Sequence, residues 1–215
     1  MAKVFTDIML DVEQFEREIN DFETLLNSKV DLSEKHDILP FFKNHQILAS
    51  QICSVLPQIN LPDKIAFEFD IFGDFASDLA LGNSSKNIYC FIEFEDARQR
   101  SLFSDETKYK PSFGRRLEHG YSQIIDWFCK LEGLQRSQDM IDRFNNPTID
   151  FYGLLIIGRS SYLDQTLKNR LDWRSKKVSV DSKKIFTYTF DELLYVMKEK
   201  LDLYKLYKNT SANFV

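Results

Sequence analysis

Apolar side chains in the amino-terminal part of the chain recur with the period of a helix. Between Asp11 and Asn27 the apolar positions are Val12, Phe15, Ile19, Phe22, Leu25 and Leu26. Acidic side chains occupy the opposite face, so an amphipathic helix is expected, which either packs within its own chain or docks on a partner. A second helix is predicted from Leu39 to Val55, because Pro57 and Pro62 follow it and cannot continue it.

The pattern changes to alternation between Phe67 and Ala97, where β-branched and aromatic residues dominate. Three short strands are predicted there, with a Gly-Asn-Ser-Ser turn at Gly82 to Ser85. The strands are expected near Ile65 to Phe72, Ser77 to Leu81 and Ile88 to Glu95.

The following segment, Arg98 to Phe113, has no periodicity and is expected to be an exposed loop. Its cations are Arg98, Arg100, Lys108 and Lys110. Such a loop, directly after a strand that carries carboxylates, could approach a phosphate-bearing substrate or be only a loop.

The carboxyl-terminal half alternates between helical and strand patterns. A helix is predicted from Gly114 to Leu134, and the apolar run Phe151 to Gly158 predicts a strand covered on both faces in parallel pairing. This order predicts a crossover unit around Gln123. The later elements are a helix at Tyr162 to Leu171, a strand at Lys184 to Thr187, and a last helix that opens with a Thr189 to Glu192 capping box and a Tyr188–Leu193 staple.

Length and composition favour one substantial globular domain of 215 residues with 43% hydrophobic content. No segment approaches the roughly 18 apolar residues of a membrane span, and no signal peptide is present, so a cytoplasmic protein without membrane contact is expected. Three widely spaced cysteines, Cys53, Cys90 and Cys129, favour reduced, buried thiols.

Charge is unevenly distributed around the formal net value of −5. Residues 1–40 contain ten acidic and four basic side chains, whereas residues 159–184 contain eight basic and three acidic ones. The second segment offers a basic surface, although a solvated helix and loop would have the same composition.

Candidate chemistry is concentrated on the third predicted strand. Glu93 and Glu95 are two residues apart and therefore share a face, while Ile92 and Phe94 pack on the other. Asp78 lies 15 residues before Glu93 and meets both if the two strands form a hairpin. Three carboxylates at one point are suited to Mg²⁺, with water and phosphate oxygens completing the octahedron, and would support phosphodiester hydrolysis. Acidic residues at strand ends are, however, most often solvated or paired with Lys or Arg.

Other catalytic classes find little support. Nucleotide-binding glycine loops, HExxH and CxxC are absent from the sequence, and His36, His45 and His119 are scattered. A structural or solvent-exposed role is expected for His119.

Several short motifs, in this order, resemble the carboxyl-terminal nuclease domain of the Shedu anti-phage defence family, a branch of the PD-(D/E)xK superfamily. They are LPFFKNHQILASQI (39–52), SDLALG (77–82), FIEFE (91–95), YSQIIDW (121–127), YGLLIIGR (152–159) and IFTYTFDELL (185–194). Together they cover about residues 38–200.

The resemblance implies a restriction-endonuclease-like α/β (α+β) fold with a mixed sheet flanked by helices and an N-terminal helical addition. Residues 1–37 would form that addition and residues 38–215 the nuclease-like domain. It further implies Mg²⁺- or Mn²⁺-dependent cleavage of DNA and a homo-oligomer. By position, Asp78 and Glu93 would be metal ligands, and Gln123 a supporting residue of the catalytic site.

Glu95 occupies the place of the family's usual lysine. Some restriction enzymes of the superfamily carry a glutamate there, where it acts as a metal ligand or general base, so Glu95 is counted among the metal and catalytic residues. The alternative is a catalytically inactive nuclease-like module that binds DNA or a partner protein. Glu68 and Asp74 are further acids near the site, and Lys86 could supply the missing positive charge.

Overall fold

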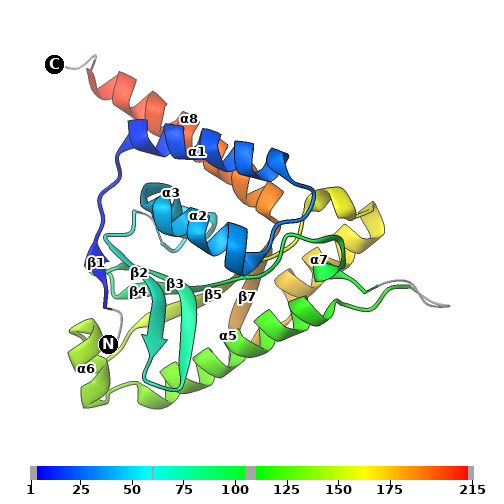
Figure 1. Cartoon of the computed structure of the whole chain (residues 1–215). Coiled ribbons are helices and arrows are strands. Elements are labelled where there is room, and N and C mark those ends of the chain that lie inside the picture. Colours follow the sequence, from blue (N-terminus) through cyan, green and yellow to red (C-terminus); the bar gives the residue numbers. More distant parts are fainter. Residues whose placement is uncertain (1–3, 60, 105–109, 213–215) are drawn as a thin grey trace.

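The structure is a computed structural model that describes residues 4–59, 61–104 and 110–212, without the side chains of residues 209–212. Lys108 lies outside the described residues. The described part of the chain forms a mixed seven-stranded sheet in the order β1-β2-β3-β4-β5-β7-β6. Helices cover both faces of this sheet (Figure 1), so the expected α/β fold is confirmed and is consistent with a restriction-endonuclease-like arrangement.

The sheet joins an antiparallel half to a parallel half at β4. The pairs from β1 to β4 are antiparallel, whereas β4, β5 and β7 run parallel. This confirms the parallel pairing predicted from the apolar run 151–158. The strands are β1 (Thr6–Asp7), β2 (Lys64–Ile71), β3 (Phe75–Asn83), β4 (Ile88–Phe94), β5 (Asp150–Ile156), β6 (Ser179–Val180) and β7 (Lys183–Tyr188).

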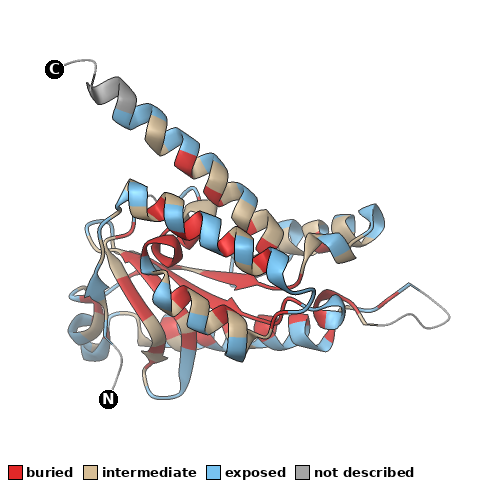
Figure 2. Ribbon diagram, turned by 45° about the horizontal axis from the view of Figure 1, so that its top comes forward, coloured by how far each residue is buried: buried red, intermediate tan, exposed pale blue. Residues whose placement is uncertain are grey.

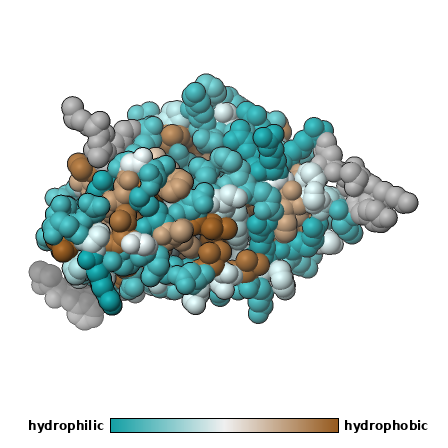
Figure 3. Space-filling model, turned by 90° about the horizontal axis from the view of Figure 1, so that it is seen from below, coloured by the Kyte–Doolittle hydropathy of each residue, from teal (hydrophilic) through white to brown (hydrophobic). Residues whose placement is uncertain are grey.

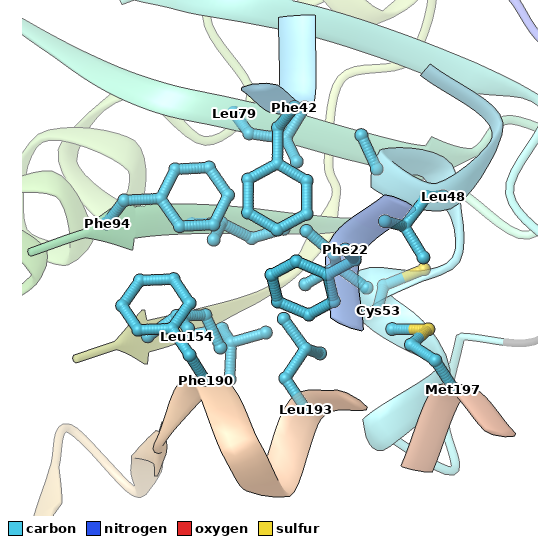
Figure 4. Packing of buried hydrophobic residues seen from close by; sticks show 14 of the residues in the cluster. Phe22, Phe42, Leu48, Cys53, Leu79, Phe94, Leu154, Phe190, Leu193 and Met197 are labelled. Atoms are coloured by element: carbon cyan, nitrogen blue, oxygen red, sulfur yellow. The ribbon is translucent and has the colours of Figure 1, made fainter. Parts of the chain in front are cut away.

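One face of the sheet is covered by helices from the two ends of the chain, which lie side by side in Figure 1. They are α1 (Val12–Ser28), α2 (Leu39–Asn44), α3 (Gln46–Ser50) and α8 (Phe190–Ala212). The residues they bury show as red stripes in Figure 2. Leu79 and Phe94 of the sheet, Phe42 of α2 and Leu193 of α8 meet in this core (Figure 4).

The opposite face carries the crossover helices. α5 (Arg115–Leu134) runs beneath the sheet, with α6 (Gln138–Phe144) and α7 (Gln165–Lys177) beside it. Residues of β3 and β4 alternate between the two cores, so that Leu79 faces α1 and α8 whereas Ala80 faces α5. Seen from below, this side of the molecule is mostly hydrophilic with small apolar areas (Figure 3).

The apolar face of α1 is buried within its own chain. Asp11 caps the helix by accepting from the amides of Glu13 and Gln14. The acidic face of α1 forms ion pairs with lysines of α8, among them Glu16–Lys205 at 2.6 Å. Intramolecular packing therefore accounts for the amphipathic pattern, while the division at residues 37 and 38 stays a prediction.

The helix predicted from Leu39 to Val55 is divided into short pieces. A π-helical turn (Glu34–Ile38) precedes α2, and a 3₁₀ turn (Ile52–Val55) follows α3. His45 separates α2 from α3 with φ −123° and ψ 66°, and its ring stacks on Phe41 with centroids 3.9 Å apart. This side-chain contact stabilises a non-helical residue that the apolar period does not reveal.

Further boundaries differ from the predictions. The segment expected as a loop contains α4 (Gln99–Leu102), and a 3₁₀ turn (Ser160–Tyr162) precedes α7, which continues past Leu171 to Lys177. Gly82 belongs to β3 rather than to the turn, since it pairs with Lys64 of β2 and Tyr89 of β4. The Tyr89 ring covers it, so that a Cβ there would lie 2.4 Å from Tyr89 Cε1. The turn is at residues 84–87.

Two of the three cysteines are buried as expected. Cys53 and Cys90 lie in the core, but Cys129 on α5 is exposed, so the expectation of a third buried thiol was wrong. Within the described residues, no helix combines the length and the apolar composition needed to cross a bilayer.

Candidate active site

The hairpin of β3 and β4 brings Asp78 and Glu93 together. The strands pair antiparallel down to Leu79 opposite Ile92, and the next position in that register is Asp78 beside Glu93. The Asp78 carboxylate accepts a hydrogen bond from the Phe94 amide at 2.8 Å. Glu93 is 6% exposed. The predicted meeting of these two acids across the hairpin is therefore present.

Both carboxyl groups are held where negative charge is unfavourable. Burial raises the pKa of Asp78, and nearby Glu34, Glu95 and Glu68 raise it further against the opposing Phe94 amide. Burial also raises the pKa of Glu93, with Asp78 and Glu95 adding to the effect. A cation between the two acids would offset this repulsion.

Helix α5 packs closely against the ends of β4 and β5 because Gly120, which faces them, has no side chain. A Cβ at Gly120 would lie 2.6 Å from Leu155 Cδ1 and 3.5 Å from Glu95 Cγ. One turn further along α5, Gln123 hydrogen-bonds the Glu93 carboxyl, and this contact favours its charged form. Gln123 Oε1 is buried and has no hydrogen-bond partner. Gln123 thus lies beside Glu93, and its amide oxygen is available to coordinate a metal ion or to accept a hydrogen bond.

Glu95 is engaged by cationic and imidazole groups of α5. Its side chain is 1% exposed, and its two oxygens lie 3.0 Å from Arg116 Nη1 and 3.0 Å from His119 Nδ1. Burial raises its pKa, while His119 and Arg116 oppose the rise. Within the described ranges, no three His, Cys, Asp or Glu side chains are grouped as a metal site. The assignment of Asp78, Glu93 and Glu95 as shared metal ligands stays a prediction.

Sequence reasoning missed two neighbours of this cluster. Arg116 lies 3.4 Å from Glu34 as well as contacting Glu95, and the backbone amide of Glu34 donates to Asp96 at 2.8 Å. Arg116, His119 and Gln123 follow helical spacing on one face of α5, a signal present in the sequence. Glu34 is far from the cluster along the chain, and only the tertiary fold brings it near.

The remaining acids near the site have other partners. Glu68 lies 2.7 Å from Lys43, although its charge still raises the pKa of Asp78. Asp74 pairs with Lys130 of α5.

The suggestion that Lys86 replaces the missing lysine was wrong. It lies in the turn at the far end of the hairpin, where Asn83, the last residue of β3, is five positions from Asp78. At about 3.3 Å per residue, this places the turn roughly 17 Å from the acids.

Arginines form the rim beside Glu95. A hollow of about 460 Å³ has Arg98, Arg100 and Arg116 in its lining, together with Asp31, Asp96, Gln99 and Ser101. A neighbouring hollow of about 330 Å³ is lined by Arg115, Arg116 and His119. These hollows place arginines of the kind that bind phosphate oxygens beside Glu95, although Arg98 and Arg116 also face Asp96.

The oxygen atoms of Asp78, Glu93 and Gln123 are of the kind that coordinates Mg²⁺ or Mn²⁺. Asp78 offers a half-buried carboxylate and Glu93 a buried one, and Gln123 offers an amide oxygen without a hydrogen-bond partner. Mg²⁺ typically takes one or two protein carboxylates and completes its shell with water and substrate phosphates. These oxygen atoms would suit a hard cation without Glu95, and metal binding itself stays a prediction.

Comparison with known proteins gives a family but no individual relative. A search of curated proteins found no match. A family model described as Shedu protein SduA, C-terminal, matches residues 31–194, which is most of the chain and contains every candidate residue named above. The chain therefore belongs to the Shedu SduA carboxyl-terminal family.

Proposed function

We propose that the protein is a metal-dependent DNA endonuclease or nickase that acts in anti-phage defence. The observation that carries the proposal is the pair of carboxyl groups on adjacent strands, the buried Glu93 and the half-buried Asp78. The defence role rests on membership of the Shedu family.

Each residue has a distinct part in the proposed reaction. Asp78 and Glu93 would hold Mg²⁺ or Mn²⁺, which polarises the phosphodiester and lowers the pKa of an attacking water. Gln123 orients the Glu93 carboxylate by its hydrogen bond. The arginine rim binds the phosphate backbone of the DNA.

Arg116 compensates for the missing lysine in this proposal. Its guanidinium reaches Glu95 at 3.0 Å and so brings positive charge to the position that the lysine would occupy. Glu95 then acts as a positioning residue for Arg116 and His119 rather than as a metal ligand. A homo-oligomer remains an additional prediction from the resemblance.

A second candidate function is a catalytically inactive module that binds DNA or a partner of a defence assembly. The engagement of Glu95 by Arg116 and His119 favours it, because a carboxylate held by these two side chains is not free to bind a metal ion. This module would keep the arginine rim and lose cleavage.

Plasmid cleavage separates the two functions. Purified protein is incubated with supercoiled and linear DNA in Mg²⁺, Mn²⁺ or EDTA, and the products are resolved on a gel. If the protein is a nuclease, it should nick DNA only in the presence of metal, and Asp78→Asn and Glu93→Gln should abolish the nicking. Asp74→Asn is the matched control, because it neutralises a nearby acid that is paired with Lys130, and it should leave nicking intact. DNA binding without cleavage in any metal would establish the inactive module instead.

A further inference from the structure

The outward face of α7 carries an unusual combination of side chains. Trp173 is 63% exposed, and Lys176 and Lys177, one turn further along the helix, are exposed as well. The other tryptophan, Trp127, is only 1% exposed. Packing in the core does not explain the position of Trp173, because its indole is exposed to solvent. The lysines beside it suggest a ligand that carries both negative charge and aromatic rings.

The lysines of this face remain accessible although the arginines of the same segment do not. Arg170 and Arg174 point inward, where Arg170 donates to the Pro111 carbonyl and Arg174 forms two bonds with Glu118. By contrast, Lys176 is 70% exposed and only loosely paired with Asp172, at 3.4 Å. The basic excess of the sequence is thus divided between half-buried arginines that bond within the chain and exposed lysines.

A groove adjoins this face at the β7 edge of the sheet. It encloses about 270 Å³, and its lining includes Lys176, Lys184, Phe186 and Tyr188. The groove also contains two acids: Asp172, which lies 3.4 Å from Lys176, and Glu192, whose carboxylate caps α8 at Thr189. Cations and aromatic rings in one groove are what single-stranded nucleic acid requires, since the backbone needs positive charge and unpaired bases stack on rings.

The groove lies at the same end of the sheet as the acidic pair. Parallel register places Phe94 of β4 level with Ile156 of β5, and Ile156 level with Tyr188 of β7. Two strand spacings amount to about 10 Å. The two bonds from Arg174 to Glu118 also fix α7 to α5, the helix that carries Gln123. The rings of Phe186 and Tyr188 pack with the α1/α8 core, whereas the acids face α5, so a bound strand reaches the carboxylates by passing around the edge of the sheet along α7.

We propose that Trp173, Lys176, Lys177 and the adjoining groove form a binding surface for single-stranded DNA. The surface holds an unpaired strand at the same end of the sheet as the Asp78–Glu93 pair, and its part in cleavage rests on the proposed nuclease function. The binding itself does not depend on cleavage. Trp173 stacks on a base while the lysines contact phosphates.

Tryptophan fluorescence tests this surface in metal-free buffer. A short oligothymidylate should quench the emission, because Trp173 is the accessible one of the two tryptophans. Trp173→Ala removes this reporter, so its binding is measured by the anisotropy of a dye-labelled oligothymidylate; it should be weaker by about 5- to 150-fold, which corresponds to the usual 1–3 kcal/mol of base stacking. Tyr195→Ala is the matched control, because Tyr195 on α8 is also 63% exposed, and it should bind like the wild type.

The charge contribution has its own measurement. Lys176→Gln combined with Lys177→Gln should reduce the slope of log affinity against log salt by about 1.4, at about 0.7 for each phosphate contact with a single strand. Unchanged binding by Trp173→Ala, or equal quenching by blunt duplex DNA, would overturn the proposal. Quenching by a protein that cuts no DNA would leave this surface standing and remove the nuclease function, whereas nicking without quenching would do the reverse.

Discussion

Gly120→Ala tests how closely α5 must approach the acidic strand. The substitution adds one methyl group where the structure leaves 2.6 Å to Leu155 Cδ1 and 3.3 Å to its Cδ2. Leu155 is fully buried, so its side chain has little room to move away. The helix must shift outward or the core must be strained.

The magnitude follows from two opposing effects. Alanine is favoured over glycine in a helix by up to about 1 kcal/mol, whereas one extra methyl group in a packed core typically costs about 1–3 kcal/mol. Gly133→Ala on the same helix supplies the first effect alone, because nothing lies within 4 Å of its added Cβ. The two variants should therefore differ by about 1–3 kcal/mol, with Gly120→Ala the less stable.

Thermal unfolding followed by circular dichroism measures this difference. For a chain of this size, about 1 kcal/mol shifts Tm by about 2–4 °C, so Tm values separated by about 2–12 °C are expected. Gly120→Ala should also reduce nicking, since it displaces Gln123 from Glu93. Equal Tm values for the two variants would refute the close approach.

Three further outcomes are expected. Thr189→Ala should lower the free energy of unfolding in urea by about 1–2 kcal/mol, because the hydroxyl of Thr189 accepts from the Glu192 amide at the start of α8. Burial raises the pKa of Asp78 to about 7. A carboxyl group with a higher pKa in the folded chain than in the unfolded chain stabilises the fold when the pH is below the pKa of the unfolded chain, and this contribution is lost as the pH rises through the pKa of the folded chain. Stability of the metal-free protein should therefore fall between about pH 4 and pH 7, and less so in Asp78→Asn; an equal slope in both would contradict the raised pKa. Cys129 should react with a thiol reagent in the folded protein, whereas Cys53, whose pKa burial raises to about 12, should react only after unfolding, as mass spectrometry can show.

The strands were predictable because their signal is local. Alternation identified β2, β3 and β4, and the apolar run identified β5 as a strand covered on both faces. The capping box at Thr189 was equally legible, since its residues lie three positions apart and bond as expected. The break at His45 was not predictable, because it depends on a ring stacking on Phe41.

The candidate site was predictable only in part. A hairpin dictates that Asp78 and Glu93 meet, and the sequence contains that hairpin. The partners of Glu95 depend on how α5 lies across the sheet, which is set by Gly120 and by packing between elements remote in sequence. Strand periodicity placed Glu95 on the right face, but the preference of its carboxylate for Arg116 is a tertiary property.

Crystals soaked with Mn²⁺ and examined by anomalous scattering test the central claim most directly. One strong peak is expected between the carboxylates of Asp78 and Glu93, with Glu95 still bound to Arg116 and His119. A map without a peak at Asp78 and Glu93, at a metal concentration that supports nicking, would contradict it.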